Sequence, residues 1–108
     1  MSAAYNLRRD LTAEVAIPAN GIVSITLQEE PRSKVVLFGF AAGQELSDHT
    51  ASVPAVVHIL SGEATVKLGD DVYDLGPHGW VHMPAHLVHA VRAKTDVVML
   101  LTMLRGGA

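Results

Sequence analysis

Residues 43–62 of the chain are GQELSDHTASVPAVVHILSG, and this stretch decides the fold. Its second half, residues 55–61, is a short run of mostly apolar, partly β-branched side chains between Pro54 and Gly62. Short apolar runs closed by turn residues are typical of strands. The stretch therefore predicts a buried strand that ends at a glycine turn. The segment before it, residues 41–53, predicts a polar loop.

Runs of the same kind recur along the rest of the chain. Within residues 21–27, side chains alternate with the period of two that a half-buried strand shows. Further short runs occupy residues 34–40, 63–68, 72–75, 80–83, 88–93 and 97–104. About eight or nine short strands without a convincing amphipathic helix predict an all-β sandwich, barrel or jelly roll.

The composition limits what the protein can be. A chain of 108 residues has the length of one domain, so we expect residues 1–108 to form a single unit. The hydrophobic content of 49% exceeds what one small core requires, which predicts a homodimer in which a second copy covers the surplus. A net charge of −3 with scattered basic residues excludes an electrostatic footprint for nucleic acid.

Compartment and membrane contact can also be predicted. No apolar run is long enough to span a bilayer, and residues 1–10 lack the apolar core of a signal peptide. The chain has no cysteine, so it offers neither disulfides nor thiol chemistry. We therefore expect a cytoplasmic protein that does not bind a membrane.

Two segments carry spaced glycines, prolines and histidines. In residues 43–62, Gly43 is followed by five residues and then by His49, and Gly62 ends the segment. In residues 78–93, Pro84 precedes His89 by five positions. Together the segments resemble the two motifs of the cupin family, G-x5-H-x-H-x3,4-E-x6-G and G-x5-P-x-G-x2-H-x3-N. The resemblance implies a double-stranded β-helix, the cupin-type jelly roll, with a histidine-lined barrel pocket.

The resemblance also implies a metal site with missing ligands. In cupins, two histidines and a glutamate of the first motif and the histidine of the second bind one divalent metal. His49 and His89 match two of these positions, whereas Ala51 and Ala55 occupy the positions of the other histidine and the glutamate. The resemblance thus implies that His49 and His89 hold Zn, Fe, Ni, Cu or Mn, although catalytic sites normally have three protein ligands.

Other polar side chains are candidates for completing the site. His58 interrupts an apolar strand, where an unpaired imidazole is costly, and is predicted as a third metal ligand. Strict alternation places it on the face opposite to Ala55, so this role requires a bulge, and burial against another subunit is the alternative. Glu45, four residues before His49, is the candidate catalytic base or else a solvated loop residue. For His82, both a pocket role and an interface role are open.

Three positions are predicted to be turns. Gly62 should have a positive φ, which other residues reach only with strain. His78 and His86 stand where the second cupin motif has glycines, and both are expected to be turn residues rather than ligands.

Three functions fit these residues. The first is a metal-dependent enzyme of oxygenase or isomerase type that acts on a small organic molecule. The second is a metal-free module that binds or senses a small ligand, with histidines as hydrogen-bonding groups. The third is a structural dimerisation domain. The fold alone does not decide among them, because cupins host many unrelated functions.

Overall fold

The computed structural model describes residues 4–106. This part of the chain forms nine strands and one turn of 3-10 helix, η1 (Leu11–Ala13). The strands are β1 (Ile22–Glu30), β2 (Ser33–Phe40), β3 (Glu45–His49), β4 (Ala55–Ser61), β5 (Ala64–Leu68), β6 (Asp71–Leu75), β7 (Trp80–Met83), β8 (His89–Ala93) and β9 (Val97–Leu104).

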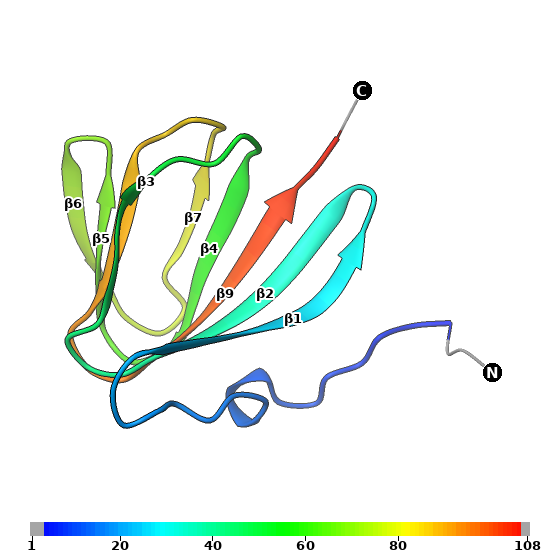
Figure 1. Ribbon diagram of the computed structural model, residues 1–108, viewed down its shortest axis with the longest axis horizontal. Helices are drawn as coiled ribbons and strands as arrows, with labels where there is room; N and C mark the ends of the chain where they lie inside the picture. Colours follow the sequence, from blue (N-terminus) through cyan, green and yellow to red (C-terminus); the bar gives the residue numbers. More distant parts are fainter. Residues whose placement is uncertain (1–3, 107–108) are drawn as a thin grey trace.

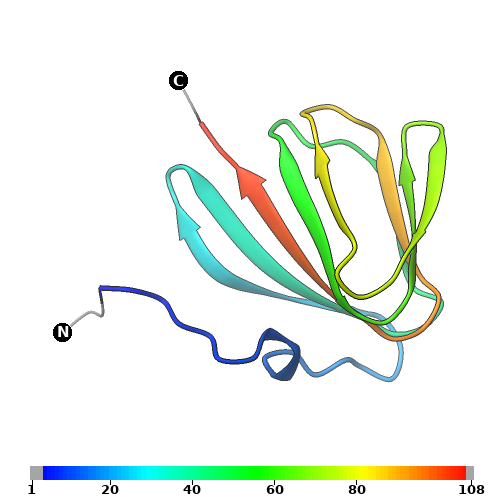
Figure 2. The same ribbon diagram turned by 180° about the vertical axis from the view of Figure 1, so that it is seen from behind.

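The strands pair into two antiparallel sheets. Sheet A has the order β1-β2-β9-β4-β7, and sheet B has the order β3-β8-β5-β6. The chain passes between the sheets at six connections, so that neighbours within a sheet are mostly distant in sequence. Figures 1 and 2 show the two sheets from opposite sides, with β1, β2 and β9 extending beyond the part that sheet B faces. This is a double-sheet jelly roll, and the predicted fold class is confirmed.

The main core lies between the sheets because each strand sends alternate side chains inward. In β4, Ala55, Val57 and Ile59 are buried in this core. From the opposite sheet, Val66 and Val91 are buried in the same cluster. The two inner faces therefore share one apolar layer, as in other sheet-on-sheet packings.

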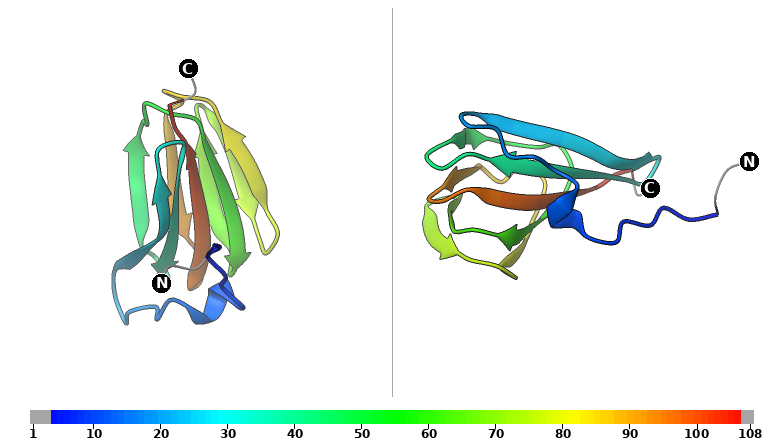
Figure 3. Two further views of the ribbon diagram at one scale, coloured as in Figure 1. Left: turned by 90° about the vertical axis from the view of Figure 1, so that its right-hand side faces the viewer. Right: turned by 90° about the horizontal axis from the view of Figure 1, so that it is seen from below.

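A second, smaller core lies on the outer face of sheet A. Leu37 and Val98 point outward from β2 and β9 and are buried with Val15 of the N-terminal segment. Leu11 of η1 packs against the same cluster. Figure 3 shows this segment, in blue, running outside the two sheets. The N-terminal residues thus cover part of an apolar face that would otherwise meet water.

The structure corrects the sequence prediction at two places. Residues 45–49 were predicted to be loop but form strand β3, the edge of sheet B. Because this strand is exposed at four of its five positions, it lacks the apolar alternation that marks a strand in a sequence. The strands predicted at residues 21–27 and 34–40 are longer than expected, since they extend to Glu30 and Ser33, which pair with each other. In residues 4–106 no helix is long and apolar enough to cross a membrane.

The glycine turn after β4 is confirmed. Gly62 has φ 82°, in the left-handed region that favours glycine. It lies where the chain leaves sheet A for sheet B. A Cβ atom built on Gly62 would lie 2.0 Å from the backbone oxygen of Asp96, which belongs to the return crossover between β8 and β9. The position therefore requires glycine for its backbone angle and for its lack of a side chain.

We expect Gly62→Ala to destabilise the fold by more than the cost of a left-handed alanine alone, which is about 1–2 kcal/mol. The matched control is Gly43→Ala, because Gly43 has φ 86° but a Cβ atom at this position would meet nothing within 4 Å. Urea unfolding should give a free-energy loss for Gly62→Ala at least ~2 kcal/mol larger than for Gly43→Ala. Equal losses would show that the close approach to Asp96 is unimportant.

Candidate functional site

Strands β3 and β8 bring His49 and His89 together. The two residues are direct partners across the strand pair, although they are 40 positions apart in sequence. The pairing is irregular between Leu46 and His49, where β3 has one residue more than β8. Leu46 and its partner Val91 face the core. A regular strand would turn His49 to the opposite face from Leu46, so the bulge is what places His49 on the inner face beside His89.

The two imidazoles share a defined orientation. Their ring centroids are 4.0 Å apart, and the ring planes are tilted by 59°. The Nδ1 atom of His49 lies 2.7 Å from the backbone oxygen of Ser47, and Nδ1 of His89 lies 2.8 Å from that of Leu87. A carbonyl oxygen can only accept, so each Nδ1 carries the proton. In the neutral rings both Nε2 atoms therefore keep their lone pairs for a metal or a ligand.

The His49–His89 pair lies at one end of the barrel. His89 is 7% exposed and His49 is exposed, so the pair runs from the interior to the surface. On sheet A, Met83, Ala55 and Met103 form the corresponding inward-facing row in register. Ala55 occupies the position of the cupin glutamate, and a methyl group stands there among apolar neighbours. This end of the barrel therefore combines two imidazoles with an apolar wall.

The pair does not satisfy the requirements of a complete metal site. Within residues 4–106, no three histidine, aspartate or glutamate side chains are grouped so that they could hold one ion. His49 and His89 can supply two nitrogen ligands, whereas structural sites use four protein ligands and catalytic sites usually three. A divalent cation fits the pair only if further ligands come from water or from a bound small molecule.

The candidate base Glu45 lies away from the histidine pair. It is the cross-strand partner of Arg92, which alternates with the inward-facing Val91 and is exposed. Glu45 therefore faces outward from sheet B. Asp48, next to His49, is held in the same outer region by an ion pair of 2.7 Å with Lys67. The hydrogen bond and the charge of Asp48 raise the pKa of Lys67. Neither carboxylate is thus placed to act at the pair.

His58 also lies elsewhere. Its neighbours in β4, Val57 and Ile59, face the main core, so His58 projects from the outer face of sheet A. Its partners across the adjacent strands are Trp80 and Leu100. The irregularity in the pairing of β4 with β9 falls between Ile59 and Ser61, beyond His58, and does not turn it inward. The structure thus brings two of the three predicted ligands together and leaves the third on the other side of the sheet.

His82 shares this outer face. It pairs with Val56 and alternates with Met83, which is buried in the main core. His82 therefore does not face the barrel pocket. It lies on the outer surface of sheet A, where the interface role stays open.

The turn histidines adopt the conformation of the glycines that they replace. His78 has φ 76° and His86 has φ 70°, and neither side chain is buried. The amide of His86 donates to the backbone oxygen of Ala51 at 2.8 Å, and the amide of His78 donates to that of Ile59 at 2.9 Å. These bonds hold the backbone in a region that costs a non-glycine residue about 1–2 kcal/mol.

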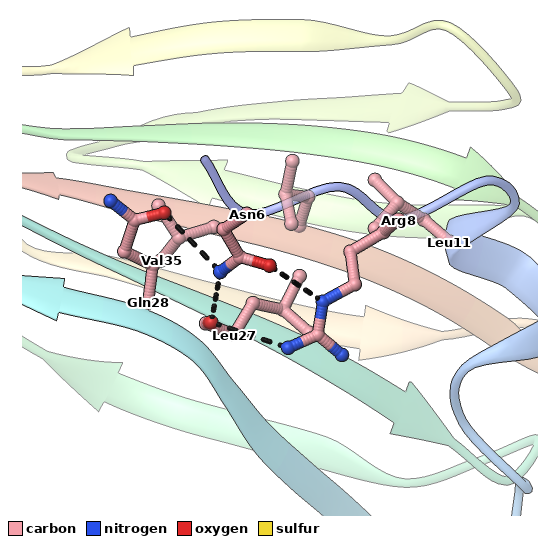
Figure 4. A pocket seen from close by; sticks show the side chains of 7 residues that line it. Asn6, Arg8, Leu11, Leu27, Gln28 and Val35 are labelled. Carbon is pink, nitrogen blue, oxygen red and sulfur yellow. Dashed lines mark hydrogen bonds between the residues drawn. The ribbon is translucent and has the colours of Figure 1, made fainter. Parts of the chain in front are cut away.

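Sequence reasoning missed a pocket outside the barrel. It encloses about 250 Å³ between the N-terminal segment and the outer face of sheet A (Figure 4). Its wall includes Leu27, the bulged residue of β1, whose backbone oxygen accepts a hydrogen bond of 2.8 Å from Asn6 Nδ2. Arg8 bonds Asn6 at 3.1 Å and Glu14 at 2.6 Å. Because these polar groups already bond one another, they fasten the N-terminal segment to β1. No sequence pattern marks the bulge on which this depends.

Comparison with known proteins identifies the family. A family model for the cupin domain matches residues 36–104. This match includes both histidines of the pair and all of the strands from β3 to β9. The chain belongs to the cupin family, as the resemblance implied.

Solved structures agree with this assignment. A conserved protein of unknown function from Streptococcus pyogenes is 31% identical over 100% of this chain and 98% of its own, with a TM-score of 0.87. A cupin superfamily protein from Desulfitobacterium hafniense is 28% identical over 97% of this chain and all of its own, also at 0.87. KdgF from a Halomonas species shares the fold at 21% identity and a TM-score of 0.73, over 80% of this chain and 81% of its own. A comparison with curated proteins found no match.

We expect His78→Gly and His86→Gly each to stabilise the protein by about 0.5–1 kcal/mol, because glycine removes the strain of a positive φ. His82→Gly in strand β7 is the control and should destabilise by a similar amount, since an extended residue gains nothing from glycine. Thermal unfolding of the three variants gives the sign. A loss of stability in both turn variants would contradict the assigned strain.

Proposed function

We propose that this cupin binds a small organic acid at the end of its barrel through a divalent cation held by Nε2 of His49 and Nε2 of His89. The observation that carries the proposal is the fixed pair of rings, 4.0 Å apart, with both Nδ1 atoms bonded to backbone carbonyls. Two groups whose remaining nitrogens are free, beside an apolar wall, are the few polar anchors that a small-molecule site requires.

A divalent metal enters this proposal as a partner of the ligand. His49 and His89 would hold the cation, and the organic acid would supply oxygen ligands in place of the missing side chains at Ala51 and Ala55. Such a cation supplies Lewis-acid chemistry and open coordination positions, which oxygenases and isomerases use. The chain itself contributes the orientation of the two rings and the apolar row of Met83, Ala55 and Met103. Among residues 4–106, no third histidine, aspartate or glutamate is grouped with the pair as a metal ligand.

Titration of Zn²⁺ into tag-free protein, with and without oxalate, tests the proposal by calorimetry. Oxalate is short enough to chelate at the histidines alone. We expect weak binding of Zn²⁺ by itself and binding at least about tenfold tighter, ~1.4 kcal/mol, when oxalate is present. His89→Ala and His49→Ala should abolish both, whereas His58→Ala, on the outer face of sheet A, should keep both.

Two outcomes of this titration would overturn the proposal. One is Zn²⁺ binding that survives His89→Ala. The other is an affinity that oxalate leaves unchanged, because the ligand would then contribute nothing to the coordination. As a second variant, Ala55→Glu places a carboxylate in the inward-facing row and should tighten Zn²⁺ binding without oxalate.

We also propose that the protein is a homodimer that associates through the outer face of sheet A. Strands β2, β9, β4 and β7 present no Asp, Glu, Lys or Arg on this face. By contrast, the outer face of sheet B carries Glu45, Arg92, Lys67 and Asp74. The N-terminal segment covers only part of the uncharged face and leaves Trp80 60% exposed.

A second copy is the occupant that this surface fits. A two-fold axis brings the same patch of both subunits together, so a patch without charges meets another patch without charges. The unequal charge of the two outer faces makes sheet A the face with the lower desolvation cost. A stable interface of this kind buries about 800 Å² on each partner.

We expect light scattering to show a dimer at micromolar concentration. Trp80→Glu should give a folded monomer, because it buries an unpaired charge in the interface. Val72→Glu is the matched control: Val72 is 61% exposed but lies on the outer face of sheet B, and this variant should stay dimeric. A monomeric wild-type protein would refute the proposal.

A further inference from the structure

The inner face of sheet B continues past the histidine pair to strand β6. The register aligns His89 with Leu68 of β5, and Leu68 with Asp71 of β6. In the next row, Val66 stands opposite Tyr73. Residues directly opposite one another share a face of the sheet. Two polar side chains of β6 therefore lie on the same face as the histidines.

Two observations fix the direction of Tyr73. Its partner Val66 is fully buried in the main core, which places Tyr73 on the inner face. The next residue, Asp74, accepts a hydrogen bond of 3.0 Å from Thr65, and both belong to the outer face. Tyr73 is nevertheless 52% exposed, because β6 is the edge strand of sheet B. Its phenol is thus inward-facing and accessible from the edge.

The row of residues between the two groups is apolar. Strand β5 separates β8 from β6, and two strand spacings amount to roughly 10 Å. Leu68 lies between His89 and Asp71 in this row and packs against the main core. The inner face thus has a polar group at each end and an aliphatic floor between them.

The two ends of this row favour ligand groups of opposite charge. A cation held by the two imidazoles attracts a carboxylate. Asp71 repels a carboxylate and accepts hydrogen bonds from hydroxyl or ammonium groups. A ligand that spans the floor is therefore oriented, with its acid at the histidines.

We infer that the ligand of this site is a short aliphatic acid with a hydroxyl or amino group at its far end, which Asp71 and Tyr73 bind. The inference rests on the proposed function, because it takes the acid group to lie at His49 and His89. Asp71 and Tyr73 on β6 are then specificity-determining residues, and the ligand lies with its acid group at the histidines.

The test compares 6-hydroxyhexanoate with hexanoate, which lacks the terminal hydroxyl. Both are titrated into Zn²⁺-supplemented protein and followed by the amide signals in ¹⁵N–¹H spectra. We expect wild-type protein to prefer 6-hydroxyhexanoate by about fivefold to tenfold, close to 1 kcal/mol for a hydrogen bond. Asp71→Asn and Tyr73→Phe should each reduce the preference for 6-hydroxyhexanoate over hexanoate towards one. Asp70→Asn, the same change one residue earlier in the turn, should retain it.

The outcomes separate the two proposals. If His89→Ala abolishes hexanoate binding while Asp71→Asn and Tyr73→Phe keep the preference, the inference about β6 is wrong and the function at the histidines stands. If hexanoate binds equally well to His89→Ala, the function itself is wrong. Absence of binding by both acids to wild-type protein would overturn both.

Discussion

The contact between Gly62 and the backbone of Asp96 is the constraint on which the barrel depends. Gly62 lies in the crossover from β4 to β5, and Asp96 lies in the crossover from β8 to β9. The crossovers are also joined by hydrogen bonds, from the amide of Lys94 to the oxygen of Glu63 at 2.9 Å and from the amide of Glu63 to Thr95 Oγ1 at 3.0 Å. Because both crossovers connect sheet A with sheet B, their contact fixes the separation of the sheets at this end. Everything that the inner faces enclose follows from that separation.

At the opposite end, one inserted residue in β3 determines the chemistry. Without the irregularity between Leu46 and His49, the imidazole of His49 would face solvent on the same side as Glu45. With it, His49 stands beside His89 on the inner face. The bulge lies in an exposed edge strand, where a ladder tolerates an additional residue most readily. The site therefore depends on a local backbone feature rather than on the burial that stabilises the fold.

This difference explains which features the sequence predicted. Strands with a buried face, such as β4 and β9, were predicted with their observed bounds because a short apolar run between turn residues reports burial directly. Strand β3 was missed because it buries almost nothing. The error propagated to Glu45: in a loop its direction is open, whereas in a strand beside the inward-facing Leu46 it must face outward. For His58 the sequence pattern was sufficient, because strict alternation within residues 55–61 already placed this side chain on the face opposite to Ala55.

Backbone angles and tertiary contacts were beyond the sequence for a different reason. The spacing of the cupin motif aligned His78 and His86 with glycines, but a histidine at such a position does not indicate whether the turn has changed or the residue is strained. The structure shows that the turns are kept, with φ values of 76° and 70°. The pocket beside Leu27 likewise requires a bulge in β1 and a segment 21 residues away in sequence. Only local periodicity is visible in a single sequence, and neither feature is periodic.

The alanines at the other two cupin ligand positions remove two metal ligands, and they also change which ligand the proposed site would favour. Ala55 is buried in a row with Met83 and Met103, so the space of a metal-binding carboxylate is lined by apolar groups. Apolar surroundings penalise a cation that only two neutral imidazoles hold, because the charge lacks both water and a counter-charge. A carboxylate from the ligand supplies that counter-charge, and its aliphatic part gains from burial against the same methyl and thioether groups. On the proposed function, the carboxylate of the ligand therefore takes the place of the acidic side chain that is absent at Ala55.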